Sequence, residues 1–314
     1  MSLPRSARSR LVSAGRNVAL IALASVAFAA CGRSATPPPG VINVVAAENQ
    51  YGSVISQLGG PYVHVTSILN NPNADPHSFE ASTRLAQDIA NAQLVVQNGL
   101  GYDTFMNQME AATPNAARVI VSAQRALGLP DSTPNPHLWY ADTTMSTVAR
   151  AITQDLITLA PGHRAFFLRA QATFQSSLNV WRQHISAFAR SHRGMRAAVT
   201  EPVADYLLQE MGVGIVTPFS FQRDIMNGTD PAPQDISLED GLFTRHTVRL
   251  FCYNVQVVSP LTLSIRSTAT SSHIPTVAVY ETMPLGDTYQ QWMMRETVAI
   301  EQAVTAHQST EKLP

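Results

Sequence analysis

Two kinds of hydrophobic pattern alternate along most of the chain and predict an α/β fold. Short apolar or alternating runs, typical of strands, are followed by longer segments whose apolar positions recur every three or four residues, as in helices. Strands that alternate with helices indicate βαβ units and parallel sheets. We therefore expect two lobes with mostly parallel sheets. The expected strands are 41–47, 62–69, 93–99, 117–122, 197–200, 214–217, 248–253 and 274–280.

One long amphipathic segment, 162–192, lies between the two sets of strands. Its expected apolar face is Phe166, Ala170, Phe174, Leu178, Trp181, Ile185 and Phe188. This spacing predicts one continuous helix, about 40 Å long at about 1.5 Å per residue. The chain then divides into an N-terminal lobe at 41–160, a linking helix at 161–193 and a C-terminal lobe at 194–314. A rigid link would limit opening between the lobes, so the irregular stretch 218–232 is the expected mobile part.

The N-terminus has a pattern of its own. Residues 1–17 carry four arginines and no acid, and a short apolar run follows that ends in F-A-A-C at Cys31. A basic segment before a short apolar run is typical of an export signal, the alternative being a buried helix. Small residues before a cysteine resemble the lipobox of bacterial lipoproteins. We therefore expect a lipoprotein signal peptide at 1–30, a lipidated Cys31 and a flexible tether at 31–40.

Composition narrows the classes of function. The net charge of −1 and the absence of Lys/Arg runs after residue 16 argue against a nucleic-acid partner. No internal segment approaches the roughly 18 apolar residues that a membrane-spanning helix needs. The second cysteine, Cys252, lies in a buried-strand pattern, so we expect a small core residue and no disulfide.

Four potential metal ligands each follow an expected strand. His77 and His137 lie in loops of the first lobe, each directly after a proline that stiffens the backbone. Glu201 and Glu281 directly follow strands of the second lobe. Because ligands of open parallel sheets bind beyond the carboxyl ends of the strands, these four side chains should converge between the lobes. Two imidazoles and two carboxylates suit Zn²⁺ or Mn²⁺.

Each candidate also has an ordinary structural interpretation. A loop histidine is most often solvated or hydrogen-bonded, Glu201 could stabilise a helix N-terminus, and Glu281 could belong to a turn. The prediction therefore rests on the set of four. The other histidines are expected to be structural or solvated. His163, His184 and His192 are expected on the solvent-exposed face of the long helix. The remaining four are His64, His246, His273 and His307.

Six motifs, taken together, carry a family resemblance. They are A-A-E-N-Q-Y-G (46–52), N-P-N-A-D-P-H-S-F-E (71–80), N-G-L-G-Y-D (98–103), N-P-H-L-W-Y (135–140), T-E-P-V (200–203) and Y-E-T-M-P-L-G-D-T-Y-Q-Q-W-M (280–293). From Val41 to the last helix the chain resembles the zinc- and manganese-binding solute-binding proteins of bacterial ABC importers, the cluster A-I lipoproteins. The resemblance implies two lobes tied by a rigid helix, with the metal between them.

The resemblance also implies a ligand set and a function. The ligands fall, in chain order, on His77, His137, Glu201 and Glu281. The protein is expected to be an exported, lipid-anchored monomer, periplasmic or at the cell surface, that captures zinc first and manganese second for an ABC permease. Two features depart from zinc-specific members: no long His-rich loop lies between the first two ligands, and Glu replaces His at the third. A metal-dependent hydrolase and a surface adhesin on the same scaffold are the alternatives.

Overall fold

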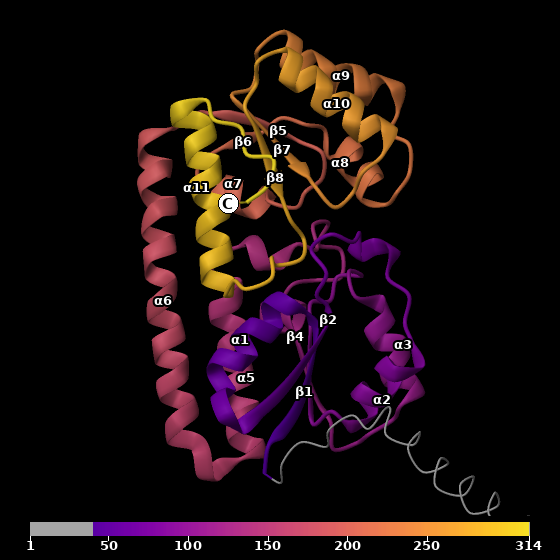
Figure 1. The fold of residues 1–314 in the computed structure, drawn as a ribbon, viewed down its shortest axis with the longest axis vertical. Coiled ribbons are helices and arrows are strands. Elements are labelled where there is room, and N and C mark those ends of the chain that lie inside the picture. Colours follow the sequence, from indigo (N-terminus) through magenta and orange to yellow (C-terminus); the bar gives the residue numbers. More distant parts are fainter. Residues whose placement is uncertain (1–39, 314) are drawn as a thin grey trace, which may run out of the picture. The chain divides into compact units, whose positions relative to one another are not determined.

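The structure, a computed structural model, describes residues 40–313, whose strands form two parallel four-stranded sheets (Figure 1). The first sheet has the order β2-β1-β3-β4 and the second has the order β6-β5-β7-β8. The strands are β1 (Ile42–Glu48), β2 (Val63–Leu69), β3 (Leu94–Gln97), β4 (Val119–Ser122), β5 (Arg196–Val199), β6 (Gly214–Ile215), β7 (Leu250–Asn254) and β8 (Thr276–Val279). The predicted α/β fold of two parallel sheets is confirmed.

Both sheets have the same topology, and this fixes where a site can form. In each, the strand order reverses between the first and third strands of the lobe, that is between β1 and β3 and between β5 and β7. Such a reversal opens a crevice beyond the carboxyl ends of the strands. Glu48 ends β1 and Asn254 ends β7, so buried polar side chains stand at both reversal points.

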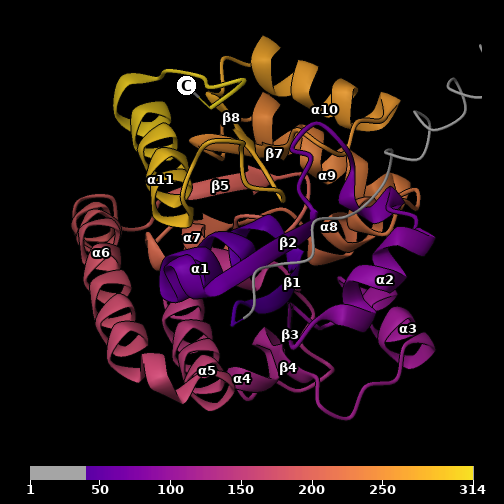
Figure 2. The same ribbon diagram turned by 60° about the horizontal axis from the view of Figure 1, so that its bottom comes forward.

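Helices cover both faces of the sheets, as Figures 1 and 2 show from two directions. In the first lobe α1 and α5 lie on one side of the sheet, and α2 and α3 lie on the other. The helices are α1 (Asn49–Gly59), α2 (Thr83–Asn91), α3 (Thr104–Ala112), α4 (Ala123–Ala126), α5 (Thr144–Leu159), α6 (Arg164–Ser191), α7 (Asp205–Glu210), α8 (Phe219–Met226), α9 (Pro233–Thr244), α10 (Pro260–Ser271) and α11 (Tyr289–Ala306). None of the helices in 40–313 combines the length and apolar content needed to cross a bilayer.

The long linking helix is α6, and its buried face differs from the prediction at its first turns. The buried residues are Phe167, Phe174, Leu178, Trp181, Ile185 and Phe188. Phe167 is buried in place of Phe166, although both rings pack edge-on against Tyr62, at centroid distances of 5.9 and 5.1 Å. His163 stacks on the same Tyr62 ring at 3.7 Å. The expected wet-face position of His163 is therefore wrong, because this residue helps to pack the helix start onto the first lobe.

The stretch 218–232 is not an irregular loop. It contains the helix α8, which buries Phe221, Gln222 and Ile225. Its apolar face is only two residues long and lies between Pro218 and Gly228, so the period of a helix is hard to distinguish there. Gln222 then donates from Nε2 to the carbonyl of Thr217 at 3.0 Å, which fixes the helix start.

The C-terminal helix α11 also links the lobes, beside α6. Its residue Gln290 exchanges hydrogen bonds with Gln57 of α1 at 3.1 and 2.8 Å. The same Nε2 atom of Gln290 donates to Ser177 of α6 at 2.7 Å. Three helices from different parts of the chain are therefore joined at one point, so the link between the lobes is broader than the single helix predicted.

Replacing Trp181 with Ala should destabilise the protein by about 3–5 kcal/mol, because it empties a large buried site. Trp181 is 1% exposed, and its Nε1 donates to Thr297 of α11 at 2.8 Å. Urea unfolding would measure the loss. The neighbouring Val180→Ala is the control, since Val180 is 57% exposed and its loss should change stability by no more than about 0.5 kcal/mol. Equal effects of the two substitutions would contradict the packing described for α6.

Candidate metal centre

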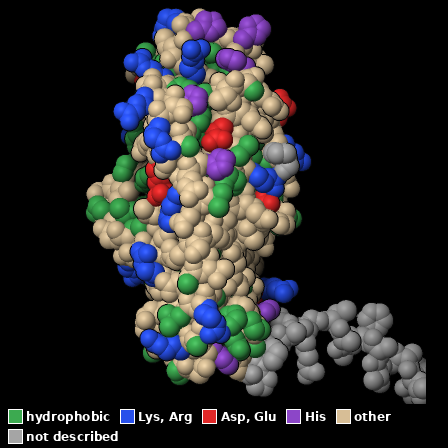
Figure 3. Space-filling model, turned by 90° about the vertical axis from the view of Figure 1, so that its left-hand side faces the viewer, with side chains coloured by type: hydrophobic (Ala, Val, Ile, Leu, Met, Phe, Trp, Pro, Cys, Tyr) green, Lys and Arg blue, Asp and Glu red, His purple; other side chains and the backbone are tan. Residues whose placement is uncertain are grey.

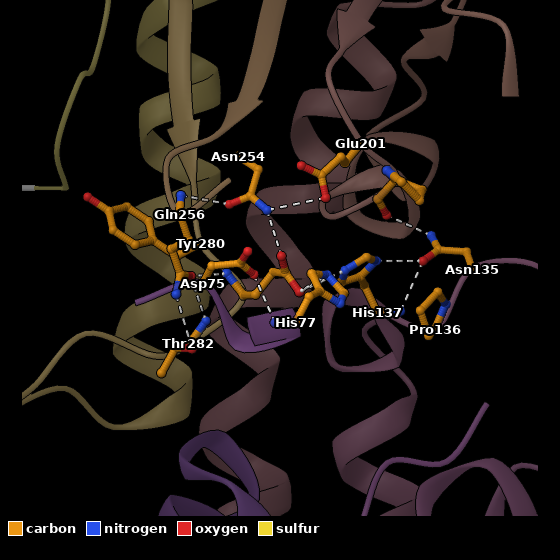
Figure 4. Close-up of polar contacts among 12 residues, drawn as sticks. Asp75, His77, Asn135, Pro136, His137, Glu201, Asn254, Gln256, Tyr280 and Thr282 are labelled. Carbon is orange, nitrogen blue, oxygen red and sulfur yellow. Dashed lines mark hydrogen bonds and ion pairs between the residues drawn. The ribbon is translucent and has the colours of Figure 1, made fainter. Parts of the chain in front are cut away.

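Three of the four predicted ligands meet between the lobes (Figure 4). Candidate ligand atoms of His77, His137 and Glu281 all lie within 4.8 Å of one another. The Nε2 atoms of His77 and His137 lie 3.3 and 3.2 Å from the same atom, Oε2 of Glu281. Two imidazoles from the first lobe thus converge on one carboxylate oxygen from the second lobe.

A short 3₁₀ turn, η2 (Pro76–Ser78), presents His77. The Asp75 carboxylate accepts a hydrogen bond from the backbone N–H of His77 at 2.8 Å, and Pro76 fixes the backbone between them. Ser78 Oγ donates to the carbonyl of Asp75 at 2.8 Å and closes the turn. The D-P-H-S sequence is therefore a self-contained turn, and the His77 side chain remains 28% exposed at its edge.

The second histidine, His137, is fully buried and is oriented by an amide. Asn135 Oδ1 lies 2.9 Å from Nδ1 of His137 and also accepts from its backbone N–H at 2.9 Å. Asn135 Nδ2 donates to the carbonyl of Pro202 in the second lobe at 2.8 Å, so the amide oxygen must face the ring. With Nδ1–H donating to that oxygen, Nε2 is the atom free to bind a metal.

The carboxylate of Glu281 stands at the end of β8 and is held from both sides. Its backbone N–H donates to Gln256 Oε1 at 2.7 Å. Asn254 Nδ2 donates to Glu281 Oε1 at 2.6 Å, which leaves Oε2 to face the two histidines. Gln256 in turn donates from Nε2 to the carbonyl of Ala74, in the loop before His77, at 2.7 Å. The loop that presents His77 is therefore tied directly to the second lobe.

The fourth candidate, Glu201, lies beside this group rather than in it. It follows β5, is 2% exposed, and its Oε2 accepts from Asn254 Nδ2 at 3.4 Å. The other oxygen, Oε1, is buried without a hydrogen-bond partner. Asn254 therefore lies between the two carboxylates and donates to both. An unsatisfied buried carboxylate oxygen next to three converging ligands is a donor that a cation would satisfy.

Burial and neighbouring charges shift the pKa values of Glu281 and Glu201 in opposite directions. Burial opposes ionisation of Glu281, but hydrogen bonds from His137 and His77, together with their charges, outweigh it and hold its pKa well below the usual range. Burial and the negative charge of Glu281 raise the pKa of Glu201 to about 8. Burial opposes a charge on His77, but the hydrogen bond and charge of Glu281 outweigh it and raise the pKa of His77 to about 9. At neutral pH these values leave both His77 and Glu201 protonated.

The amide side chains around the site were not identified from the sequence. Asn254, Gln256 and Asn135 orient the ligands, and Asn49 exchanges hydrogen bonds with the backbone of Met283 at 2.7 and 3.0 Å across the lobes. The position of Asn254 in the sequence could have indicated its role. It ends a buried strand, and Glu201 and Glu281 lie just after the ends of their own strands. A neutral amide at a strand end is not itself a usual metal ligand, so its position alone does not indicate a role in the site.

The two cysteines have different outcomes. Cys252 is buried and free in β7, as expected of a small core residue. Cys31, the predicted lipidation site, lies outside the described residues, as do the predicted signal peptide and nearly all of the tether.

Residues 44–303 match the protein family described as ZnuA, zinc-uptake complex component A, periplasmic. At the level of sequence, the zinc-binding protein TroA of Treponema pallidum is 22% identical over 153 residues, which cover 47% of this chain and 49% of TroA.

Solved structures share the fold at low identity. The periplasmic zinc-binding protein TroA of T. pallidum matches with a TM-score of 0.72 and 16% identity, over 86% of this chain and 100% of that chain. The solute-binding protein FpvC of Pseudomonas aeruginosa, in complex with Mn²⁺, has a TM-score of 0.70 and 19% identity, over 85% and 99%. A mutant of the laminin-binding adhesin Lmb of Streptococcus agalactiae has a TM-score of 0.70 and 17% identity, over 84% and 100%.

Proposed function

This chain belongs to the family of zinc-uptake complex component A, and we propose that it captures a divalent transition metal and delivers it to the membrane permease of an ABC importer. Like the members of this family, it is a metal-binding solute-binding protein and not an enzyme. The metal is proposed to be zinc first and manganese second. The ligands are proposed to be His77, His137, Glu201 and Glu281.

One observation carries the assignment of the site. The Nε2 atoms of His77 and His137 point at the same oxygen of Glu281, at 3.3 and 3.2 Å, with hydrogen bonds behind each group that fix its direction. A divalent ion in the middle would accept electron pairs from both Nε2 atoms and from the carboxylate oxygen. The two carboxylates would also neutralise its charge, which allows a cation to be buried between the lobes.

The donor set supports zinc ahead of manganese by a small margin. Two nitrogen and two oxygen donors suit a tetrahedral Zn²⁺ site, and the general affinity order of divalent metals sets Zn²⁺ above Mn²⁺. The second carboxylate favours Mn²⁺ more than a third imidazole would. TroA is named as zinc-binding and FpvC was solved with Mn²⁺, so both metals occur on this fold.

Replacing Glu201 with His should shift preference toward Zn²⁺, by about tenfold relative to Mn²⁺, because it exchanges an anionic oxygen for a nitrogen. Metal analysis of protein purified without added ions, followed by competition between Zn²⁺ and Mn²⁺, would measure both the native metal and the shift. His184→Ala on α6 is the control and should change neither. Absence of bound metal at micromolar concentrations of either ion would overturn the proposed function itself.

The location and organisation of the protein are proposed on the sequence alone. The periplasmic family supports export, and we propose a monomer, lipid-anchored through Cys31, periplasmic or at the cell surface. The lobes are proposed at 41–160 and 194–314, with the link at 161–193. The similarity to Lmb concerns the fold alone, so it does not support a function as a surface adhesin for this chain.

Mass spectrometry of the mature protein should find Cys31 as the first residue, carrying lipid. The expectation follows from the arginine-rich start, the apolar run and the small residues before this cysteine. Cys31→Ala should leave an unmodified protein that is not anchored. A mature chain that begins at any other residue would contradict the lipid anchor while leaving the metal site unaffected.

A further inference from the structure

A basic pocket lies at the end of the second lobe where α6, α9 and α11 finish. It has a volume of about 530 Å³, and no carboxylate is among its lining residues. Figure 3 shows basic and histidine side chains gathered at the top of the face along α6. The charged and imidazole side chains that line the pocket are Arg193, Arg196, Arg249, His192, His246 and His307.

The charge of this pocket contrasts with that of the molecule around it. Five of the 21 Lys/Arg residues precede residue 40, where there is no acid, so residues 40–314 carry 16 cations against 22 anions. Four other arginines pair with acids: Arg182, Arg223, Arg266 and Arg295. The three arginines of the pocket have no such partner among the described residues. The pocket is therefore a local excess of positive charge on an acidic protein.

Two of these arginines stand side by side on neighbouring strands. Ala197 of β5 pairs with Leu250 of β7, so the preceding residues Arg196 and Arg249 are aligned, and Arg249 N–H donates to the carbonyl of Arg196 at 2.9 Å. Like charges at adjacent positions on paired strands are destabilising. The strand pairing thus sets the backbones of two exposed arginines side by side, and an anion between their side chains would offset the repulsion of the two charges.

An ordinary structural role explains only part of this cluster. Basic residues and histidines are favoured at helix C-termini, and His246 and His307 follow helices with positive φ angles of 51° and 53°, where a glycine is more usual. Arg196 and Arg249 are different, because Arg196 begins β5, Arg249 directly precedes β7, and neither caps a helix. Their convergence with the helix-end histidines is what indicates a ligand.

We propose that this pocket binds an anion of the phosphate type. Guanidinium groups match the oxygens of such an anion with paired N–H donors, and an imidazole adds a ring N–H. The three arginines would repel a metal cation, so the histidines here do not form a second metal site. The pocket lies at the start of β5 and β7, whereas Glu201 and Asn254 stand at the opposite ends of the same strands. Anion binding is therefore independent of the proposed metal site.

The anion has two possible sources, inorganic phosphate or pyrophosphate in solution and the headgroup of an anionic lipid. Calorimetry of the chelator-treated full chain with phosphate and pyrophosphate tests the first. Co-sedimentation with phosphatidylglycerol vesicles, compared with phosphatidylcholine vesicles, tests the second, because a lipid anchor would contribute equally to both. Saturable binding of either soluble probe, or a preference for phosphatidylglycerol, is expected at one site per chain.

Two variants separate binding from folding. Arg196→Gln with Arg249→Gln should weaken anion binding at least tenfold and should not lower the melting temperature, since it removes a repulsion. His246→Gly with His307→Gly should also weaken binding but keep both helix ends, because glycine accepts a positive φ. Arg84→Gln is the matched control, as Arg84 is an exposed arginine on α2 that likewise has no ion-pair partner within residues 40–313.

Three outcomes would overturn the proposal. One is no saturable binding of phosphate or pyrophosphate together with equal sedimentation with both kinds of vesicle. Another is a loss in Arg84→Gln as large as in the double arginine variant, which would show a general effect of charge. The third is a large fall in melting temperature of the double arginine variant without an anion present, which would give these residues a structural role.

Discussion

Replacing Glu281 with Gln should lower the affinity for Zn²⁺ on the order of 10³-fold, about 4 kcal/mol. The substitution keeps the shape of the side chain but removes the one ionised group that faces both histidines, at 3.3 and 3.2 Å. It also leaves Asn254, which donates to Glu281 at 2.6 Å, without its anionic acceptor. Calorimetry with a competing chelator would measure the affinity, and the rise in melting temperature on adding metal should be lost in parallel.

The chain offers a closely matched control for this experiment. Between α6 and α11, Nδ1 of His184 lies 3.5 Å from a carboxylate oxygen of Glu301, in a pair of the same chemistry that is far more exposed. Glu301→Gln should leave metal affinity unchanged. His77→Ala and His137→Ala should each weaken binding strongly, since each removes a nitrogen donor. Unaltered affinity in Glu281→Gln would show that the metal binds elsewhere.

The affinity for metal should fall about 10³-fold between pH 9 and pH 7. A metal can bind His77 and Glu201 only when both have lost their protons, and their pKa values are raised to about 9 and about 8. Below its pKa, each group costs about tenfold in affinity per pH unit, so His77 contributes about two decades and Glu201 about one. Glu281 contributes nothing in this range, because its pKa lies well below the usual value for a carboxyl group.

The same two protons should appear in solution when the metal binds. Calorimetry at pH 7 in two buffers of different ionisation enthalpy should report the release of about two protons per ion. In Glu201→Gln the release should drop to about one. A histidine with an ordinary pKa would lose its metal between about pH 6 and 7, and the contact with Glu281 moves this range upward for His77. An affinity that is flat between pH 7 and pH 9 would contradict the raised values.

The elements that carry the site could be predicted because each has a strong local signal. A proline before His77 and before His137, and the strands before Glu201 and Glu281, place these residues without any knowledge of tertiary contacts. The hydrogen bonds that aim them could not be predicted in this way. Asn49 and Met283 are more than two hundred positions apart, and no local pattern indicates that an amide will meet that backbone.

The mistakes in the fold have a similar origin. Phe166 and Phe167 are equally apolar neighbours that both contact Tyr62, so the apolar pattern alone does not show which of the two is buried. His163 was assigned to solvent because it is polar, but a neutral imidazole can stack on an aromatic ring, as it does on Tyr62. Helix α8 was missed because a helix with only two turns repeats its apolar period too few times to be recognised.

The hydrogen bonds that amide side chains make across the lobes affect how long an ion stays in the site. The hydrogen bonds of Asn49 with Met283, Asn135 with Pro202 and Gln256 with Ala74 all join the half that supplies nitrogen to the half that supplies oxygen. Opening those links would move the nitrogen donors away from the oxygen donors, so the links oppose the loss of a bound ion. The links should therefore lengthen the residence time of the ion, and a docking partner that competes for these backbone carbonyls would speed release without touching a ligand.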